Sequence, residues 1–241
     1  MPNELISVPA GLNGVAAAST SIGDVDGDRG FFHYRQYDAT SIARTEPLEA
    51  AWHLVTLGTL PDAAALGEIR ARIGGVRRLP NAVRTALPGL VRSGLGDMAL
   101  LAAALTMVAA ERSHRPTVDA SSTDIERDAL ELAACSPTVV AAAHRLRLGL
   151  APIEPDPSLG HAADYLRMVT GREPSAAHTQ ALERYLVLTI DHGFNASTFT
   201  ARVVTSTGAT VAAAMSAGLA ALSGPLHGGA PSRALDALDE I

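Results

Sequence analysis

The sequence lacks three features that would each point to a particular class of protein. It has one cysteine, Cys135, which cannot form an internal disulfide and fits a reducing compartment. No apolar stretch reaches membrane-spanning length without polar interruption, and the start, Met1-Pro2-Asn3-Glu4, has neither the basic nor the apolar region of a signal peptide. The 19 Lys and Arg residues are scattered, which argues against a nucleic-acid surface. We therefore expect a cytoplasmic protein that binds neither nucleic acid nor membrane.

The residues that are abundant favour helices. Hydrophobic residues make up 47% of the 241 residues, whereas aromatic residues make up only 4%. Alanine, the best helix former, is prominent among them, and continuous β-branched sequence is scarce. This length allows one large domain or two small ones, with enough apolar material for a sizeable core. The composition therefore predicts an all-α protein.

Turn and capping residues divide the chain into expected elements. Only residues 14–35 look strand-like, and Asp26-Gly27 within them predicts a tight turn, so a β-hairpin is expected there. Two stretches are expected to be irregular: the loop 113–121 and the proline-rich connector 152–157. Helices are expected at about 45–58 (with Thr45 as cap), 60–75, 81–94, 98–112, 123–135, 136–148, 158–170, 175–190, 195–222 (interrupted at Gly208) and 231–241.

Alternating aspartates at positions 24, 26 and 28 superficially resemble the start of a calcium loop. The sixth position of that loop is Arg29 instead of glycine, and the twelfth is Arg35 instead of a bidentate glutamate. A solvated hairpin turn explains the aspartates better. No pair of histidines has the helical spacing of a metal site either, so no metal is expected.

Two further patterns also have structural explanations. Gly94-Leu95-Gly96 with Ala99 partly mimics a dinucleotide fingerprint, but no strand precedes it, so a helix break is the better interpretation. Cys135 has apolar neighbours and no basic residue beside it, which favours a buried, unreactive thiol.

The first segment with chemical character is Asp191-His192-Gly193-Phe194-Asn195-Ala196-Ser197-Thr198. An apolar helix is expected to end before it, and Asn195 is expected to cap the next one. An imidazolium beside the free N–H groups of that second helix would favour an anionic ligand. The alternative is that His192 caps the end of the preceding helix.

The second such segment is Ser223-Gly224-Pro225-Leu226-His227-Gly228-Gly229-Ala230-Pro231. Its glycines remove side chains around His227, so a ligand could approach the imidazole and the nearby amides. A neutral imidazole placed before a helix could donate a hydrogen bond to a carbonyl that is becoming an enolate. The alternative is a plain glycine-rich turn.

Together these two segments resemble the paired active-site signature of the citrate synthase family. The other matching segments are Gly11–Val15, Asp24–Gly27, Tyr34–Asp38 (with Gln36 in place of glycine), Trp52–Pro61, Ser136–Ala142, His144–Arg147 and Asp156–Ala163. The resemblance covers nearly the whole chain. It implies a large helical domain over residues 36–241, preceded by an N-terminal segment, residues 1–35, that carries the β-hairpin.

The resemblance also implies the chemistry and the residues that perform it. Citrate synthases condense acetyl-CoA with oxaloacetate to give citrate and CoA, with no permanently bound cofactor, and they form homodimers. In that reaction an aspartate removes an α-proton and the position of His227 stabilises the enol. The position of His192 helps to hold oxaloacetate. The position of Ser197 supports the catalytic imidazole and fixes its tautomer. Asn195 and Gly228 match the family's substrate-binding segments, although helix capping could be the whole role of Asn195.

The chain also departs from the family pattern. Ala230-Pro231-Ser232 replaces the usual Ala-Asn-Glu, and family members continue beyond the position of Ile241. That continuation carries the aspartate base, a further histidine, the arginines that clamp oxaloacetate and most of the CoA site. The 241 residues alone, without the family's small domain, are therefore expected to be inactive. Two alternatives stay open: a 2-methylcitrate synthase that uses propionyl-CoA, and a non-catalytic homologue that serves in dimerisation or ligand binding. The reading frame after Ile241 would separate an enzyme from the non-catalytic homologue.

Overall fold

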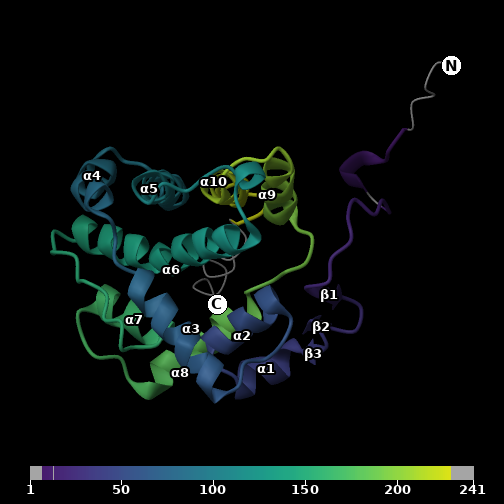
Figure 1. Cartoon of the computed structure of the whole chain (residues 1–241), viewed down its shortest axis with the longest axis horizontal. Helices are drawn as coiled ribbons and strands as arrows, with labels where there is room; N and C mark the ends of the chain where they lie inside the picture. The colour runs from purple at the N-terminus through teal and green to yellow at the C-terminus, as the bar shows by residue number, and fades with distance from the viewer. Residues whose placement is uncertain (1–6, 13, 229–241) are drawn as a thin grey trace, which may run out of the picture.

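The computed structural model describes residues 7–12 and 14–228, and the expected helix at 231–241 lies outside them. The helices form layers around the long helix α6, with α4, α5, α10 and α9 on one side and α7, α3, α2, α1 and α8 on the other (Figure 1). The bounds are β1 Gly23–Asp26, β2 Phe31–Tyr34, β3 Tyr37–Asp38, α1 Ala39–Thr45, α2 Leu48–Leu57, α3 Ala63–Val76, α4 Asn81–Arg92, α5 Asp97–Glu111, α6 Ser122–Arg147, α7 His161–Thr170, α8 Ala176–Leu188, α9 Ala196–Ser206 and α10 Val211–Leu222, with short 3-10 turns at Ala10–Leu12 and Thr117–Asp119.

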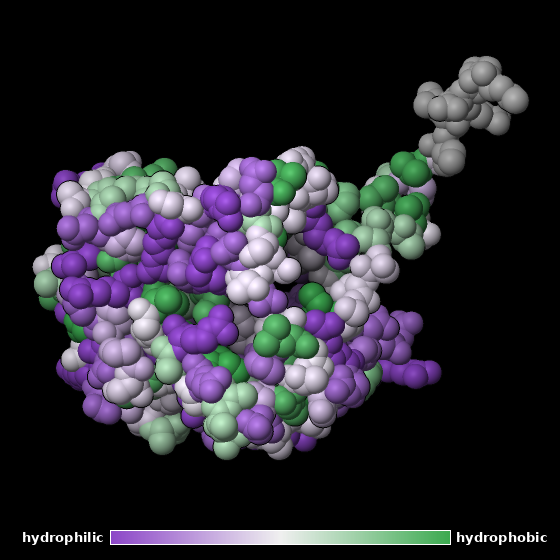
Figure 2. Space-filling view, viewed as in Figure 1, coloured by the Kyte–Doolittle hydropathy of each residue, from purple (hydrophilic) through white to green (hydrophobic). Residues whose placement is uncertain are grey.

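The described residues bury two apolar clusters, one on each side of the molecule. The larger one packs α4, α5, α6 and α10 together through residues such as Leu105, Leu132 and Val139. The smaller one joins β2, α1, α2 and α8 around Tyr34 and Leu54. Hydrophilic and apolar side chains intermingle over the face of the molecule shown in Figure 2. Apart from the short strands β1, β2 and β3, the regular elements of the described residues are helices, which confirms the expected all-α fold with a short hairpin.

The hairpin begins later than the sequence suggests. β1 starts at Gly23 and pairs antiparallel with β2, so that Gly23 faces Tyr34, and β3 extends the sheet from β2. Residues 15–20 form no strand, which corrects the expectation of strand-like structure from residue 14. These small residues are exposed, so they offer little side-chain surface with which to stabilise cross-strand pairing.

Most helix boundaries match those expected, because local signals set them. Asp62 and Ser175 cap α3 and α8 with their side chains, and Gly208 (φ 78°) separates α9 from α10. The expected cap at Thr45 is wrong, since Thr45 ends α1 and α2 is preceded by Pro47. α1, a short helix capped by Asp38, was not expected from the sequence.

The expected break between residues 135 and 136 is also wrong. α6 runs unbroken through Pro137, although proline removes one helical hydrogen bond and strains the preceding turn. Leu132 and Val139, on either side of the proline, belong to the same apolar cluster. Because both halves of α6 bury side chains in one core, packing offsets the local cost of the proline.

Buried charges tie the connector 152–157 and α7 to the rest of the molecule. Arg77 Nη1 donates to Asp164 Oδ2 at 2.7 Å, and both side chains are almost fully buried. The backbone N–H of Asp156 also donates to the Asp164 carboxylate at 3.1 Å. At the start of α7, the N–H of His161 donates to Glu49 Oε1 at 2.8 Å. Asp164 therefore anchors the connector, and Glu49 links α2 to α7.

His161 should make the stability of the protein depend on pH. Burial, with a smaller effect from Arg77, lowers the pKa of His161 to about 4. The pKa of a histidine in the unfolded chain is about 6.5. Below this pH the imidazole of His161 is protonated in the unfolded chain but stays neutral in the folded state. The stability present above pH 6.5 is therefore lost as the pH falls toward 4, by about 3 kcal/mol. Urea unfolding across this range should give a shallower pH dependence for His161→Gln than for the unsubstituted protein. If the two proteins lose stability in parallel as the pH falls, the pH dependence does not come from His161.

Candidate functional site

The two histidine segments occupy helix junctions. Residues 189–195 connect α8 to α9, and residues 223–228 form a turn after α10. α9 and α10 pack directly against each other, so the two junctions are parts of one local structure. This arrangement allows residues on α9 to contact the turn that contains His227.

Asn195 caps α9, as its sequence context predicts. Its Oδ1 accepts a hydrogen bond from the N–H of Thr198 at 3.0 Å. His192 is exposed and makes no side-chain hydrogen bond with a described residue. Its alternative role as a cap of α8 is not seen, because Thr189 bonds to the carbonyls of Tyr185 and Leu186. His192 is therefore free to contact a ligand from solvent.

His227 belongs to a hydrogen-bonded chain that joins three of the predicted site residues. Its Nε2 lies 3.0 Å from Ser197 Oγ, although the two residues are separated by 30 positions. Ser197 Oγ in turn lies 2.7 Å from Asn195 Oδ1. Asn195, Ser197 and His227 are thus coupled, and the Nδ1 atom of the imidazole is left for another partner.

The single hydroxyl proton of Ser197 sets the tautomer of the neutral His227 ring. If Ser197 donates to Asn195, Nε2 must carry the ring proton and Nδ1 can only accept. If Ser197 donates to Nε2, the ring proton sits on Nδ1, which can then donate to a ligand. The interaction between Ser197 and His227 therefore decides whether the free side of the ring is a donor or an acceptor.

The turn around His227 can form only with glycine at position 228. The N–H of Gly228 donates to the Leu222 carbonyl at 3.0 Å, and a Cβ at this position would lie 2.1 Å from that oxygen. The N–H of His227 donates to Gly224 at 3.0 Å. Gly228 is therefore required by the packing of the turn, whereas the approach of a ligand to the imidazole stays a prediction.

Residues 11–241 match the family described as "Citrate synthase, C-terminal domain". The chain belongs to the citrate synthase family. It is 33% identical over 233 residues to the citrate synthase of Acidithiobacillus ferridurans, covering 96% of this chain and 60% of that protein. It is 34% identical over 239 residues to the 2-methylcitrate synthase of Mycobacterium tuberculosis, covering 99% of this chain and 60% of that protein. The chain therefore spans about 60% of the length of these curated relatives.

Solved structures of citrate synthases have the same fold. The Thermotoga maritima enzyme superposes with a TM-score of 0.86 at 28% identity, covering 98% of this chain and 61% of that one. The Thermoplasma acidophilum enzyme, solved as a ternary complex with carboxymethyl coenzyme A and oxaloacetate, superposes with a TM-score of 0.84 at 27% identity, covering 95% of this chain and 59% of that one. The citrate synthase fold is therefore present over nearly all of the chain.

The hairpin braces the α8–α9 junction of this citrate synthase family member, a role that the sequence analysis did not identify. Tyr34 Oη donates to the Val187 carbonyl at 2.8 Å, and burial raises the pKa of Tyr34 to about 12. A Cβ at Gly23 would lie 2.3 Å from the His33 carbonyl and 3.4 Å from Asp191 Oδ2, so β1 runs close to the junction. The Tyr-Arg pair at 34–35 was noted only as a family resemblance, and nothing in its local sequence indicates this contact.

A large cavity adjoins the same junction. Its volume is about 690 Å³, and Arg35, Trp52 and Asp191 are among its lining residues. His192 and His227 do not line it. The cavity alone therefore gives no reason to place a substrate of the citrate synthase reaction in it.

The aspartates of the hairpin and Cys135 have the structural roles that their sequence context predicts. Asp26 Oδ1 accepts from the N–H of Arg29 at 3.1 Å, as expected for a solvated hairpin turn. Cys135 is fully buried, and burial raises its pKa to about 12. Within residues 7–12 and 14–228, no group of three His, Cys, Asp or Glu side chains could hold a metal ion. None of the described helices is both long and apolar enough to cross a membrane.

Proposed function

We propose that the intact protein condenses acetyl-CoA with oxaloacetate to give citrate and CoA, in a Claisen condensation. The observation that carries this proposal is the hydrogen bond between His227 Nε2 and Ser197 Oγ, at the two positions that match the family's catalytic pair. In this reaction a base removes an α-proton from the thioester, and the enol attacks the ketone carbon of oxaloacetate. Hydrolysis of the citryl thioester then releases citrate and CoA.

The proposed role of His227 fixes the direction of its hydrogen bonds. Enolisation places negative charge on the thioester oxygen, which needs a donor at that point. Since Nε2 faces Ser197, Nδ1 is the atom available to donate. In the structure Ser197 Oγ donates to Asn195 Oδ1 at 2.7 Å, so in the reaction its hydroxyl must turn to donate to Nε2, while Asn195 Oδ1 still accepts from the N–H of Thr198. Ser197 and Asn195 thus act as positioning residues for the imidazole.

His192 and Gly228 are proposed to contact substrate. His192 is exposed beside the N-terminus of α9, where an imidazole N–H and the free N–H groups of the helix can both donate to an anion such as oxaloacetate. Gly228 is proposed as a substrate-binding residue from the family match alone, since the space of its missing Cβ is occupied by the Leu222 carbonyl, 2.1 Å away. The ternary complex of the Thermoplasma acidophilum relative supports this substrate pair.

The acyl donor and the catalytic competence of the chain are tested by a single assay. CoA release from acetyl-CoA or propionyl-CoA, with oxaloacetate, is followed with a thiol reagent. The 241 residues alone should release CoA at least about two to four orders of magnitude more slowly than a complete family member, because the resemblance places the base beyond them. Near-family rates from these residues alone would overturn that assignment.

The same assay on the full-length protein decides among the three candidate functions. Faster turnover of acetyl-CoA supports citrate synthase, and faster turnover of propionyl-CoA supports 2-methylcitrate synthase. No turnover of either thioester would favour a non-catalytic dimerisation or ligand-binding protein. The chain is 33% identical to a citrate synthase and 34% identical to a 2-methylcitrate synthase, so sequence identity does not decide between acetyl-CoA and propionyl-CoA as the acyl donor.

We further propose that the protein forms a homodimer through α9 and α10. α9 buries none of its residues in the described chain, and it exposes Phe199 and Val203. Sedimentation at micromolar concentration should show a dimer, and Val203→Asp should shift it toward monomer. Leu148→Asp, at an exposed apolar residue after α6, is the matched control and should leave the dimer intact. A stable monomer of the unsubstituted protein would contradict the proposal.

Two further expectations stay predictions. One is the boundary between segments 1–35 and 36–241, and the other is the cytoplasmic location.

A further inference from the structure

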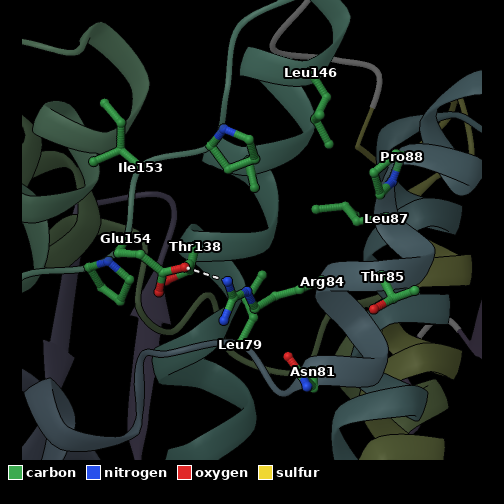
Figure 3. Close-up of a pocket in the computed structure, with 13 residues that line it drawn as sticks. Leu79, Asn81, Arg84, Thr85, Leu87, Pro88, Thr138, Leu146, Ile153 and Glu154 are labelled. Carbon is green, nitrogen blue, oxygen red and sulfur yellow. Dashed lines mark ion pairs between the residues drawn. The ribbon is translucent and has the colours of Figure 1, made fainter.

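The pocket between α4, the C-terminal half of α6 and the connector at 152–155 has its charged groups already paired (Figure 3). Arg84 Nη2 lies 3.4 Å from Glu154 Oε1, and these are its two charged lining residues. The hydroxyl of Thr138 is buried in the wall. His192, by contrast, is exposed and makes no side-chain hydrogen bond within residues 7–12 and 14–228. The position of its imidazole therefore depends on its neighbours in the chain.

Strand β1 lies against the residues on either side of His192. A Cβ added at Gly23 would lie 3.4 Å from Asp191 Oδ2, and one added at Gly193 would lie 3.7 Å from Val25 Cγ2. Gly23 and Val25 are two positions apart on β1, so both positions face the same side of the strand. One face of β1 thus contacts the chain both before and after His192.

The Asp191 carboxylate closes the turn that contains His192. Its Oδ2 accepts a hydrogen bond from the N–H of Gly193 at 3.3 Å, across His192. Gly193 has φ 67°, a left-handed conformation that glycine adopts without steric cost. Asp191 is half-buried, whereas His192 between the two bonded residues is exposed. The carboxylate oxygen of Asp191 therefore orients the peptide that follows His192 and leaves the imidazole in solvent.

Helix α9 contacts the same junction. The guanidinium of Arg202 lies 5.3 Å from the centroid of the Phe194 ring, and the Phe199 ring lies 5.4 Å from that ring. Arg202 Nη1 also donates to the carbonyl of Ser19 at 3.3 Å, shortly before β1. A cation over an aromatic face is attracted to it. Phe194, two residues after His192, is thereby held on α9, so the turn is anchored at both of its ends.

We propose that Asp191 is a positioning residue for oxaloacetate: it holds the turn against β1, so that the imidazole of His192 keeps the orientation that binds the substrate. This inference rests on the proposed contact between His192 and oxaloacetate. A carboxylate beside an anion site would by itself weaken binding through like-charge repulsion. The benefit of Asp191 therefore comes from the hydrogen bond that it accepts, and its charge contributes nothing favourable.

Two substitutions in the full-length protein separate the hydrogen bond from the charge. Asp191→Ala removes the acceptor and should raise the Kd for oxaloacetate, measured by isothermal titration calorimetry, by about threefold to tenfold. Asp191→Asn keeps an acceptor oxygen without the charge and should bind within about twofold of the unsubstituted protein. Asp24→Ala, on the opposite face of β1, is the matched control and should leave the Kd unchanged. Equal or tighter binding by Asp191→Ala, or equal weakening by Asp191→Asn, would overturn the proposal.

A double substitution shows whether Asp191 acts through His192. In a His192→Ala background, Asp191→Ala should change the Kd by less than about twofold, because no imidazole is left to position. The single variant Asp191→Ala should also keep kcat within about twofold, since the contact between His227 and Ser197 is untouched. A full, additive loss of affinity in the His192→Ala background would mean that Asp191 has a purely structural role, and would reject the proposal.

The outcomes also separate this inference from the proposed function. If the unsubstituted full-length protein binds no oxaloacetate, both are wrong. If it binds oxaloacetate and His192→Ala weakens binding whereas Asp191→Ala does not, only the role of Asp191 is wrong. Thermal melts accompany each variant. Should Asp191→Ala fail to fold, Asp191→Glu takes its place: it keeps the charge, but its extra methylene displaces the oxygen from the Gly193 N–H, so the Kd should rise likewise.

Discussion

His227→Ala should lower kcat of the intact protein by about two to three orders of magnitude, with a smaller change in oxaloacetate affinity. A donor on the thioester oxygen stabilises the enol-like transition state more than the ground state, so its loss falls mainly on turnover. Steady-state kinetics with thermal melts alongside measure both quantities. The structure adds a reason to expect an effect on catalysis, because His227 Nε2 is already held by Ser197.

Two further variants separate catalysis from folding. His192→Ala should mainly raise the KM for oxaloacetate, because the exposed His192 makes no side-chain hydrogen bond within residues 7–12 and 14–228. Ser197→Ala should lower kcat less than His227→Ala does, since it frees the ring without removing it. If folded His227→Ala keeps near-normal turnover, the catalytic assignment is wrong and the histidine merely completes a turn.

Asp164→Ala should lower the free energy of unfolding by about 3–5 kcal/mol. Removing this carboxylate leaves the Arg77 guanidinium, 1% exposed, as a buried charge without its 2.7 Å partner. It also removes the acceptor of the Asp156 N–H, which fixes the connector before α7. Urea unfolding, analysed by linear extrapolation, measures the change.

An exposed ion pair provides the comparison for Asp164. Asp97 pairs with Arg147 at the surface, so Asp97→Ala should cost less than about 1 kcal/mol. Similar losses for the two aspartate variants would mean that burial of the Arg77–Asp164 pair has no special weight. A loss confined to Asp164→Ala would show that this pair holds α7 and the connector against α3.

Short-range sequence signals determine several of the helix ends. Gly58, with φ 88°, and the side-chain cap Asn195 were both expected to mark helix ends, and the structure confirms them. Each of these features depends on atoms within about four residues along the chain, so the sequence carries the whole signal. The pairing of the two histidine segments was expected only from the family resemblance.

The sequence by itself determined the helical class, most helix boundaries and the residues of the candidate site. Only the tertiary structure decided that α6 continues through Pro137, that Tyr34 braces Val187 and that Arg77 is buried against Asp164. The contact between His227 and Ser197, 30 positions apart, was expected from the family resemblance, and the packing of α9 against α10 brings the two residues together. Local preferences of a few tenths to about 3 kcal/mol per residue set the caps and turns, but burial of whole helix faces is larger and can overrule them. Which distant side chains meet depends on how those faces pack, and no short stretch of sequence encodes that.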